Sequence, residues 1–250
     1  TMVVLRQREM CNRDSSYLSL SGLNGYSGRL GERTPIMGAP IADLAGGSLH
    51  AVIGILAAVN QRHISGEGQY VDISMTDAMF SMNSLFGSSY LAAGVEPTPG
   101  STYLGGGSFY DYYLTADNRY LSIGSLEPQF FQALCAALGD NSLLELGNVE
   151  SPETQKLLKQ KLDEIIVQKT LTEWVRIFEK TEACVEPVLT FSEACASEQI
   201  TSRELLVDVK NYDQGTQQQI GNPIKMSKSV PRYDSIGSPV GLHNKEVLQD

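Results

Sequence analysis

One stretch of the sequence decides how the chain is interpreted: residues 40–48 read PIADLAGGS. From residue 44 to about residue 62 the sequence is apolar on nearly every side of a helix, which predicts a buried helix. An aspartate just before a helix is usually an N-cap, so this is the ordinary interpretation of Asp43. Capping leaves Gly46 and Gly47 unexplained, since each glycine inside a helix costs roughly 0.8–1 kcal/mol relative to alanine. The pair predicts that another helix or a ligand approaches the backbone closely.

Asp43 also fits the requirements of a carboxylate nucleophile. A carboxylate at the N-terminus of a helix lies in a positive field that favours its anion. Free N–H groups at the same helix end can stabilise oxygen charge that develops nearby. A carboxylate that attacks a thioester carbonyl needs both properties. The spacing alone is a weak signal, so the cap and the nucleophile both remain open.

Outward from this stretch, strands and helices alternate, which favours an α/β fold over an all-α or all-β fold. Residues 1–40 are polar and rich in glycine and proline, as is typical of irregular loops. We expect a strand at residues 70–73, one helix over residues 75–93 and a glycine- and proline-rich linker at residues 95–106. The remaining expected elements are strands at 109–114, 119–123 and 185–189, and helices at 127–138, 152–168, 171–181 and near residue 245.

Composition argues against several classes of function. The net charge of −10 argues against nucleic-acid binding, because phosphate neutralisation needs clustered Lys and Arg. No stretch approaches the ~20 uninterrupted apolar residues that span a bilayer, so we expect no membrane partner. The cysteines show no CxxC pairing and no histidine partners at metal spacing, so we expect free thiols, no metal site and a cytoplasmic location. They are Cys11, Cys135, Cys184 and Cys195.

Several blocks of sequence together resemble the signature of the class III CoA transferases. The main blocks are residues 40–48, residues 54–58 (GILAA) and residues 66–77 (GEGQYVDISMTD). Shorter matches are residues 19–22 (SLSG), 123–130 (IGSLEPQF), 184–188 (CVEPV) and 241–248 (GLHNKEVL). The blocks extend over essentially all 250 residues in the family's order. This is the family of carnitine CoA transferase, formyl-CoA transferase and α-methylacyl-CoA racemase.

The resemblance implies a class III CoA-transferase fold. Part of a large CoA-binding α/β domain would take residues 1–94 and 196–250, and a smaller α+β domain residues 107–195, with residues 95–106 as the linker. Two such ring-shaped chains form an interlocked homodimer in this family. The family's large domain begins with a longer N-terminal segment, which we expect this sequence to lack. On that expectation the sequence is a fragment, or a separate chain supplies the segment.

The resemblance also places the family's catalytic aspartate at Asp43. In the transferases this residue attacks an acyl-CoA, giving an acyl-aspartyl anhydride and then an aspartyl-CoA thioester. The expected ligands are therefore an acyl-CoA and a small carboxylic acid, with no permanently bound cofactor and no metal. A mobile glycine loop that covers the aspartate would fall on residues 105–107, although such a run is most often a flexible linker. The residues expected near CoA or substrate are Arg13, Tyr17, Gly46, Gly47, Gly105, Gly106 and Gly107.

One departure from the family pattern bears on the reaction. Racemases carry a histidine in a Gly-His-Asp-x-x-Tyr segment, but residues 12–17 here read NRDSSY, so Arg13 takes the place of the histidine. An always-charged guanidinium cannot shuttle protons near neutral pH, which counts against two-base racemisation. His50 is the nearby substitute, seven residues after Asp43, although a core histidine is the more ordinary interpretation. Glu127 matches a glutamate of the racemases, and a first-turn acid favoured by the helix dipole explains it equally well.

Three functions stay open at this point. The leading hypothesis is a transferase that moves CoA between an acyl-CoA and a free carboxylate through Asp43. The second is α-methylacyl-CoA epimerisation, with Asp43 as one base and Glu127 or His50 assisting. The third is an incomplete, non-catalytic subunit that works only with a partner chain. The sequence does not identify the acyl group.

Overall fold

The computed structural model describes residues 13–147, 151–213 and 215–249. It is a mixed α and β structure that divides into two compact units, one ending at Pro187 and the other beginning at Val188. Each unit is described by itself. The division into large and small domains expected from the family resemblance stays a prediction.

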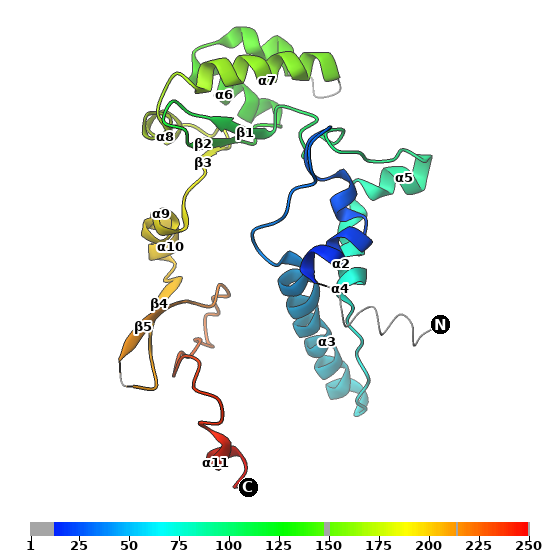
Figure 1. Ribbon diagram of the computed structural model, residues 1–250, viewed down its shortest axis with the longest axis vertical. Coiled ribbons are helices and arrows are strands. Elements are labelled where there is room, and N and C mark those ends of the chain that lie inside the picture. The colour runs from blue at the N-terminus through cyan, green and yellow to red at the C-terminus, as the bar shows by residue number, and fades with distance from the viewer. Residues whose placement is uncertain (1–12, 148–150, 214, 250) are drawn as a thin grey trace. The chain divides into compact units, whose positions relative to one another are not determined.

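The first unit opens with a group of helices, of which α3 is the longest (Figure 1). These are α2 (Asp14–Leu20), the 3-10 helix η1 (Leu23–Tyr26), the π-helix η2 (Ala42–Leu49), α3 (His50–Ser65), α4 (Met75–Ser81), the 3-10 helix η3 (Met82–Ser84) and α5 (Gly87–Ala93). The helix η2 continues directly into α3. A small core, in which Tyr17, Leu18, Ala42 and Met79 are buried, joins α2, η2 and α4.

Two elements expected in this region differ from the structure. The single helix expected over residues 75–93 is wrong, because it breaks after α4. There the Asn83 side chain donates hydrogen bonds to the backbone oxygens of Phe80 (2.9 Å) and Ser21 (3.0 Å), and such bonds compete with the helical pattern. The strand expected at residues 70–73 is also wrong. Val71 and Ile73 instead pack against α3 at Gly54, where an added Cβ would lie 2.9 Å from Val71 Cγ1.

The sequence predicts a buried helix over residues 44–62. The helix is confirmed, but its burial is wrong. Its large apolar side chains are exposed, with Leu56 at 63%. The segment Ala42–Ser65 is long and apolar enough to cross a membrane. An apolar stretch of 18 residues within it has a mean hydropathy of 1.6, and 11% of that stretch is buried. Length and composition are weak evidence of a membrane span, because the core helix of a soluble protein passes the same test. Apolar exposure of this kind marks a surface that other protein or lipid covers.

The rest of the first unit is a three-stranded antiparallel sheet covered by helices. The strands are β1 (Asp111–Leu114), β2 (Tyr120–Ile123) and β3 (Val185–Pro187), in the order β1-β2-β3. Tyr113 pairs with Leu121, and Ile123 pairs with Val185. The helices are α6 (Pro128–Leu138), the 3-10 helix η4 (Asn141–Leu146), α7 (Pro152–Ile166) and α8 (Leu171–Phe178). Figure 1 shows α6 and α7 over one face of the sheet.

This part of the chain follows its sequence pattern closely. The stripe Leu171, Trp174 and Phe178 is buried in the main core, as the helical spacing predicts. Gly139 ends α6 with a φ of +76°, the left-handed conformation expected of a C-terminal glycine. The α8 helix begins with a capping box, in which the Glu173 carboxylate accepts hydrogen bonds from the Thr170 backbone N–H (2.8 Å) and hydroxyl (2.7 Å).

The second unit is smaller. Two short helices, α9 (Phe191–Ala196) and α10 (Glu198–Ser202), precede a hairpin of β4 (Leu206–Lys210) and β5 (Thr216–Ile220). The closing helix expected near residue 245 is confirmed as α11 (Asn244–Val247).

Candidate active site

The Asp43 side chain is exposed and does not cap its helix. The N-cap position is Ile41, and no side-chain cap is made there. Among the residues that the structure describes, none donates a hydrogen bond to the Asp43 carboxylate. Its backbone groups are both held: the N–H donates to Asp14 Oδ1 (3.1 Å), and the carbonyl oxygen accepts from Ser48 Oγ (3.1 Å). The cap interpretation of Asp43 is therefore wrong, and its two carboxylate oxygens are accessible.

Asp14 satisfies this helix end instead. Its Oδ1 accepts hydrogen bonds from the backbone N–H groups of Ala42 (2.6 Å) and Asp43 (3.1 Å). The N–H of Leu44 donates to the carbonyl oxygen of Pro40 (2.9 Å). The amides expected to be free for a developing oxygen charge are thus occupied. That part of the sequence prediction is wrong.

A neighbouring helix explains the glycine pair. A Cβ on Gly46 would lie 3.2 Å from Met79 Cε and 3.3 Å from the backbone oxygen of Met75. A Cβ on Gly47 would lie 3.3 Å from Met75 Cγ. The close approach predicted from the sequence is real, and its source is α4. Of the two alternatives left open, packing of helices accounts for both positions.

His50 follows the last turn of the π-helix. Its Nδ1 lies 2.6 Å from the carbonyl oxygen of Ala45. Because a carbonyl oxygen only accepts hydrogen bonds, Nδ1 carries the proton in this contact. No described contact joins the side chains of His50 and Asp43. His50 therefore fits a structural histidine better than an assisting base.

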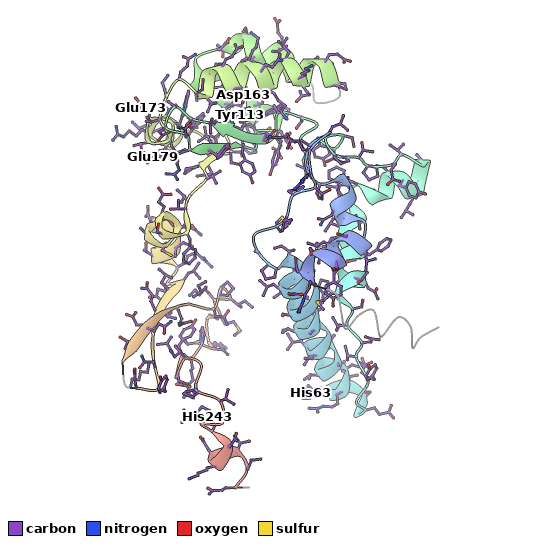
Figure 2. The ribbon with its side chains drawn as sticks, viewed as in Figure 1. His63, Tyr113, Asp163, Glu173, Glu179 and His243 are labelled. Atoms are coloured by element: carbon purple, nitrogen blue, oxygen red, sulfur yellow. The ribbon has the colours of Figure 1, made fainter. Side chains whose placement is uncertain are left out.

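His63 lies farther from the site, in the last turn of α3. Figure 2 labels this histidine near the end of α3 that is remote from η2. Twenty residues of helix correspond to about 30 Å, so His63 is too far from Asp43 to exchange a proton with it in this chain.

Tyr17 belongs to α2, and Arg13 immediately precedes that helix, next to Asp14. Arg13 is exposed at the N-cap position of the helix. Tyr17 is buried and packs with Leu18, Ala42 and Met79. Of these two residues expected near the substrate, the structure leaves Arg13 accessible and places Tyr17 in the core.

The glycines at residues 105–107 form a packed turn. A Cβ on Gly107 would lie 2.8 Å from the backbone oxygen of Thr102, and Gly106 has a φ of +95°. Lys159 Nζ donates to the backbone oxygen of Gly106 (3.0 Å) and thereby fastens the turn to α7. In this structure the three glycines thus lie in a packed turn, and both the flexible linker and the mobile loop stay predictions.

Asp111 connects this turn to two cations. Its carboxylate lies 2.7 Å from a guanidinium nitrogen of Arg29 and 2.8 Å from Lys159 Nζ. Burial alone would raise the pKa of Asp111, but hydrogen bonds from Lys159 and from the Tyr112 amide, together with the charge of Lys159, outweigh it and hold the pKa below its ordinary value. A cavity of about 220 Å³ borders this group and the glycine turn.

The pKa of a second acid near Asp111 shifts in the opposite direction. Burial, together with the charge of Asp111, raises the pKa of Asp163. Figure 2 labels Asp163, an exposed residue of α7, near Tyr113, a buried residue of β1. Burial also raises the pKa of Tyr113.

Glu127 occupies the N-cap position of α6 and is exposed. Its side chain makes no capping hydrogen bond. It lies close enough to Cys184 that burial and the charges of Glu127, Glu182 and Glu186 raise the pKa of that thiol. The assistance of Glu127 to Asp43 stays a prediction.

Sequence reasoning missed two features of this region. Asp14 stood inside the quoted segment NRDSSY, but nothing in that segment indicated a contact with residues 42 and 43. The other feature is a cavity of about 540 Å³ with mostly apolar walls, including Phe80, Tyr90 and Leu91. It reaches Ser21, just beyond the end of α2 opposite Asp14.

In the described part of the chain, no group of three metal-binding side chains occurs.

Comparison with known proteins gives consistent results. The model of a family described as CoA-transferase family III matches residues 6–244. Alpha-methylacyl-CoA racemase from Homo sapiens is 32% identical over 244 residues, which cover 96% of this chain and 62% of the relative. Succinate–glutarate CoA-transferase from Agrobacterium fabrum is 25% identical over 239 residues, with 92% and 59% covered. The chain thus spans less than two thirds of the length of these relatives.

A solved structure shares the fold. The crystal structure of a CAIB/BAIF family protein from Brucella suis matches with a TM-score of 0.75 at 22% identity. The match covers 95% of this chain and 62% of that chain.

Proposed function

The chain belongs to CoA-transferase family III, and from this premise we propose that it moves CoA between an acyl-CoA and a free carboxylic acid, with Asp43 as the nucleophile. One observation carries the proposal. The Asp43 carboxylate is exposed and receives no hydrogen bond from any described residue, while its backbone N–H is held by Asp14. A carboxylate with this freedom can reach an electrophile, whereas a capping carboxylate could not.

The proposed reaction needs no external acid or base. An Asp43 oxygen attacks the thioester carbonyl, the C–S bond breaks, and an acyl-aspartyl anhydride and a CoA thiolate form. The thiolate then attacks the aspartyl carbonyl, which releases the first acid as its carboxylate and leaves an aspartyl-CoA thioester. The carboxylate of the second acid repeats these two steps in reverse. Asp43 is regenerated, and no net proton is transferred.

Arg13 supports a carboxylic acid as the second substrate. Its guanidinium is exposed beside Asp14, and no ion pair of Arg13 is found among the described side chains. The planar fork of a guanidinium matches the two oxygens of a carboxylate. We propose that Arg13 binds the acid while it waits to attack.

Trapping of the intermediate tests this proposal. The protein is incubated with an acyl-CoA, treated with hydroxylamine and digested, and the modified peptide is identified by mass spectrometry. We expect a hydroxamate on Asp43, and we expect Asp43→Asn to bind CoA but give neither hydroxamate nor transfer. Asp77→Ala, which removes an exposed first-turn acid of α4, is the matched control and should react normally. Normal transfer by Asp43→Asn would end the proposal.

Acyl-CoA epimerisation is a second candidate function. The 32% identity to the human racemase favours it. In that reaction Asp43 would move a proton at the carbon next to the thioester, with Glu127 or His50 assisting. Incubation in deuterium oxide separates the two functions, since epimerisation introduces deuterium at that carbon and CoA transfer does not.

The assembly and location of the protein are also proposals. The family resemblance supports a homodimer, and the exposed face of α3 supports further contacts with protein. Because the chain spans 62% of the human relative, a partner chain that completes the enzyme is the alternative. Native mass spectrometry of the purified protein distinguishes a homodimer from a complex of two kinds of chain. The cytoplasmic location is a proposal that rests on the free cysteines.

A further inference from the structure

The N-terminus of the Asp43 helix is capped by a residue from another helix. An N-cap side chain usually belongs to the residue that immediately precedes the first turn. Here that position is Ile41, whose side chain cannot accept a hydrogen bond. The acceptor is Asp14, 28 residues before Ala42 and 29 before Asp43.

This arrangement separates two tasks that one carboxylate cannot perform together. A side chain that accepts N–H bonds from the first turn lies against the backbone and is held there. Asp14 takes that task through a single oxygen, with contacts of 2.6 Å to the Ala42 nitrogen and 3.1 Å to the Asp43 nitrogen. The Asp43 carboxylate is left to project from the same turn into solvent.

The helix that carries Asp14 is held in place by packing. It lies in the first turn of α2, and Tyr17 and Leu18 of that helix pack against Ala42 and Met79. The backbone amides of Ala42 and Asp43 are thus both tied to α2, a helix that shares a core with η2.

We propose that Asp14 is a positioning residue for Asp43, a role that rests on the proposed function. By holding the Ala42 and Asp43 amides, Asp14 sets the direction in which the Asp43 carboxylate approaches the thioester carbon. A misplacement of about 1 Å in a reacting group costs about 10²-fold in rate, so a loose first turn should be visible in kcat. Asp14 does not touch the substrate in this account.

Two substitutions at Asp14 separate positioning from charge. Asp14→Asn keeps an oxygen that accepts both N–H bonds, and asparagine caps helices about as well as aspartate. Asp14→Ala removes the acceptor. The matched control is Asp140→Ala, because Asp140 is also an aspartate that caps a helix: as the N-cap residue of η4 it accepts a 2.9 Å bond from the Ser142 amide.

The kinetic readout is the division of the effect between kcat and KM. We expect Asp14→Ala to lower kcat about 10²-fold with the KM for acyl-CoA nearly unchanged, because a misdirected nucleophile weakens the transition state and not substrate binding. Asp14→Asn should stay within about fivefold of the wild type. Asp140→Ala should lose stability but keep kcat. A kcat as low in Asp14→Asn as in Asp14→Ala would overturn the positioning role, and so would a wild-type kcat in Asp14→Ala.

Amide hydrogen exchange at Ala42 and Asp43 tests the contact without turnover. Both amides should be protected in the wild type and in Asp14→Asn, and should exchange rapidly in Asp14→Ala. Rapid exchange in the wild type would overturn the cap whatever the activity. If both amides are protected but no Asp43 adduct forms with an acyl-CoA, the proposed function fails, and the catalytic role of Asp14 falls with it.

Discussion

Replacing Gly46 and Gly47 one at a time by alanine separates the two explanations of this glycine pair. At residue 46 the new Cβ would lie 3.3 Å from the backbone oxygen of Met75 and 3.2 Å from Met79 Cε. At residue 47 it would meet only the Met75 side chain among its nearest contacts outside η2, at 3.3 Å from Cγ and 3.4 Å from Sδ. A backbone oxygen cannot retreat without moving α4, whereas a methionine side chain readily changes its conformation.

The expected magnitudes follow from two opposing effects. Alanine gains about 0.8–1 kcal/mol of helix propensity over glycine. Forcing an extra carbon into a packed contact costs about 1–3 kcal/mol. At Gly46 the steric cost should prevail, so the free energy of unfolding should fall by about 1 kcal/mol. At Gly47 the methionine gives way, and we expect a change within about 0.5 kcal/mol.

Urea unfolding of the two variants supplies the measurement. If the slopes agree with the wild type, a shift in the midpoint is a change in stability. The KM for acyl-CoA is measured in parallel, because a ligand that needed these glycines would bind more weakly to the variants. A Gly47→Ala variant with wild-type stability and a strongly raised KM would refute the packing explanation.

Four further predictions concern other contacts in the first unit. Lys159→Met removes the donor to Gly106, so amide exchange at residues 105–107 should accelerate; unchanged exchange would mean that Lys159 does not hold the turn. Asp111→Asn should lower the urea midpoint at pH 7, because a lowered carboxyl pKa stabilises the fold above the ordinary value of 3.8, and the gap should close as the pH falls below that value. Asp163→Asn should raise the midpoint at pH 7, because a raised pKa favours the fold only when the carboxyl is protonated, and the gain should shrink towards pH 3.8. Either gap staying constant with pH would contradict the assigned shift. Asn83→Ala should lower the free energy of unfolding by about 2 kcal/mol, since it leaves the Ser21 and Phe80 oxygens without their donor; a midpoint equal to the wild type would contradict this.

The sheet and its covering helices were predictable because their information is local. The stripe of Leu171, Trp174 and Phe178 indicates one buried face, and that face is covered by residues of the same unit. Gly139 ends α6 because glycine readily adopts the positive φ found there, which depends on no distant residue. In such cases a short window of sequence contains both the pattern and its cause.

The exposure of α3 was not predictable in this way. The apolar residues around Leu56 indicate a helix that must be covered, but they do not say by what. In the described part of the chain, Val71 and Ile73 pack against α3 at Gly54, while large side chains such as Leu56 stay exposed. The apolar pattern of the sequence therefore predicted the helix correctly, but it did not predict whether the helix is buried.

At the site, sequence reasoning identified the position and misassigned the contacts. It placed a free or capping carboxylate at Asp43, and the structure has the carboxylate free. It offered a helix or a ligand as the neighbour of Gly46, and the helix α4 is that neighbour. The hydrogen bonds from Ala42 and Asp43 to Asp14 were out of reach, because a contact between residues 28 or 29 positions apart leaves no local pattern.

Oxygen-18 transfer tests the central claim most directly. If Asp43 attacks acyl groups and CoA passes through its carbonyl carbon, a second acid labelled in both carboxylate oxygens delivers one labelled oxygen to Asp43 when its new thioester forms. After repeated turnovers in unlabelled water, mass spectrometry of the peptide that contains residue 43 should show the label there and not at Asp77. Rapid CoA transfer with no label in Asp43 would contradict the account.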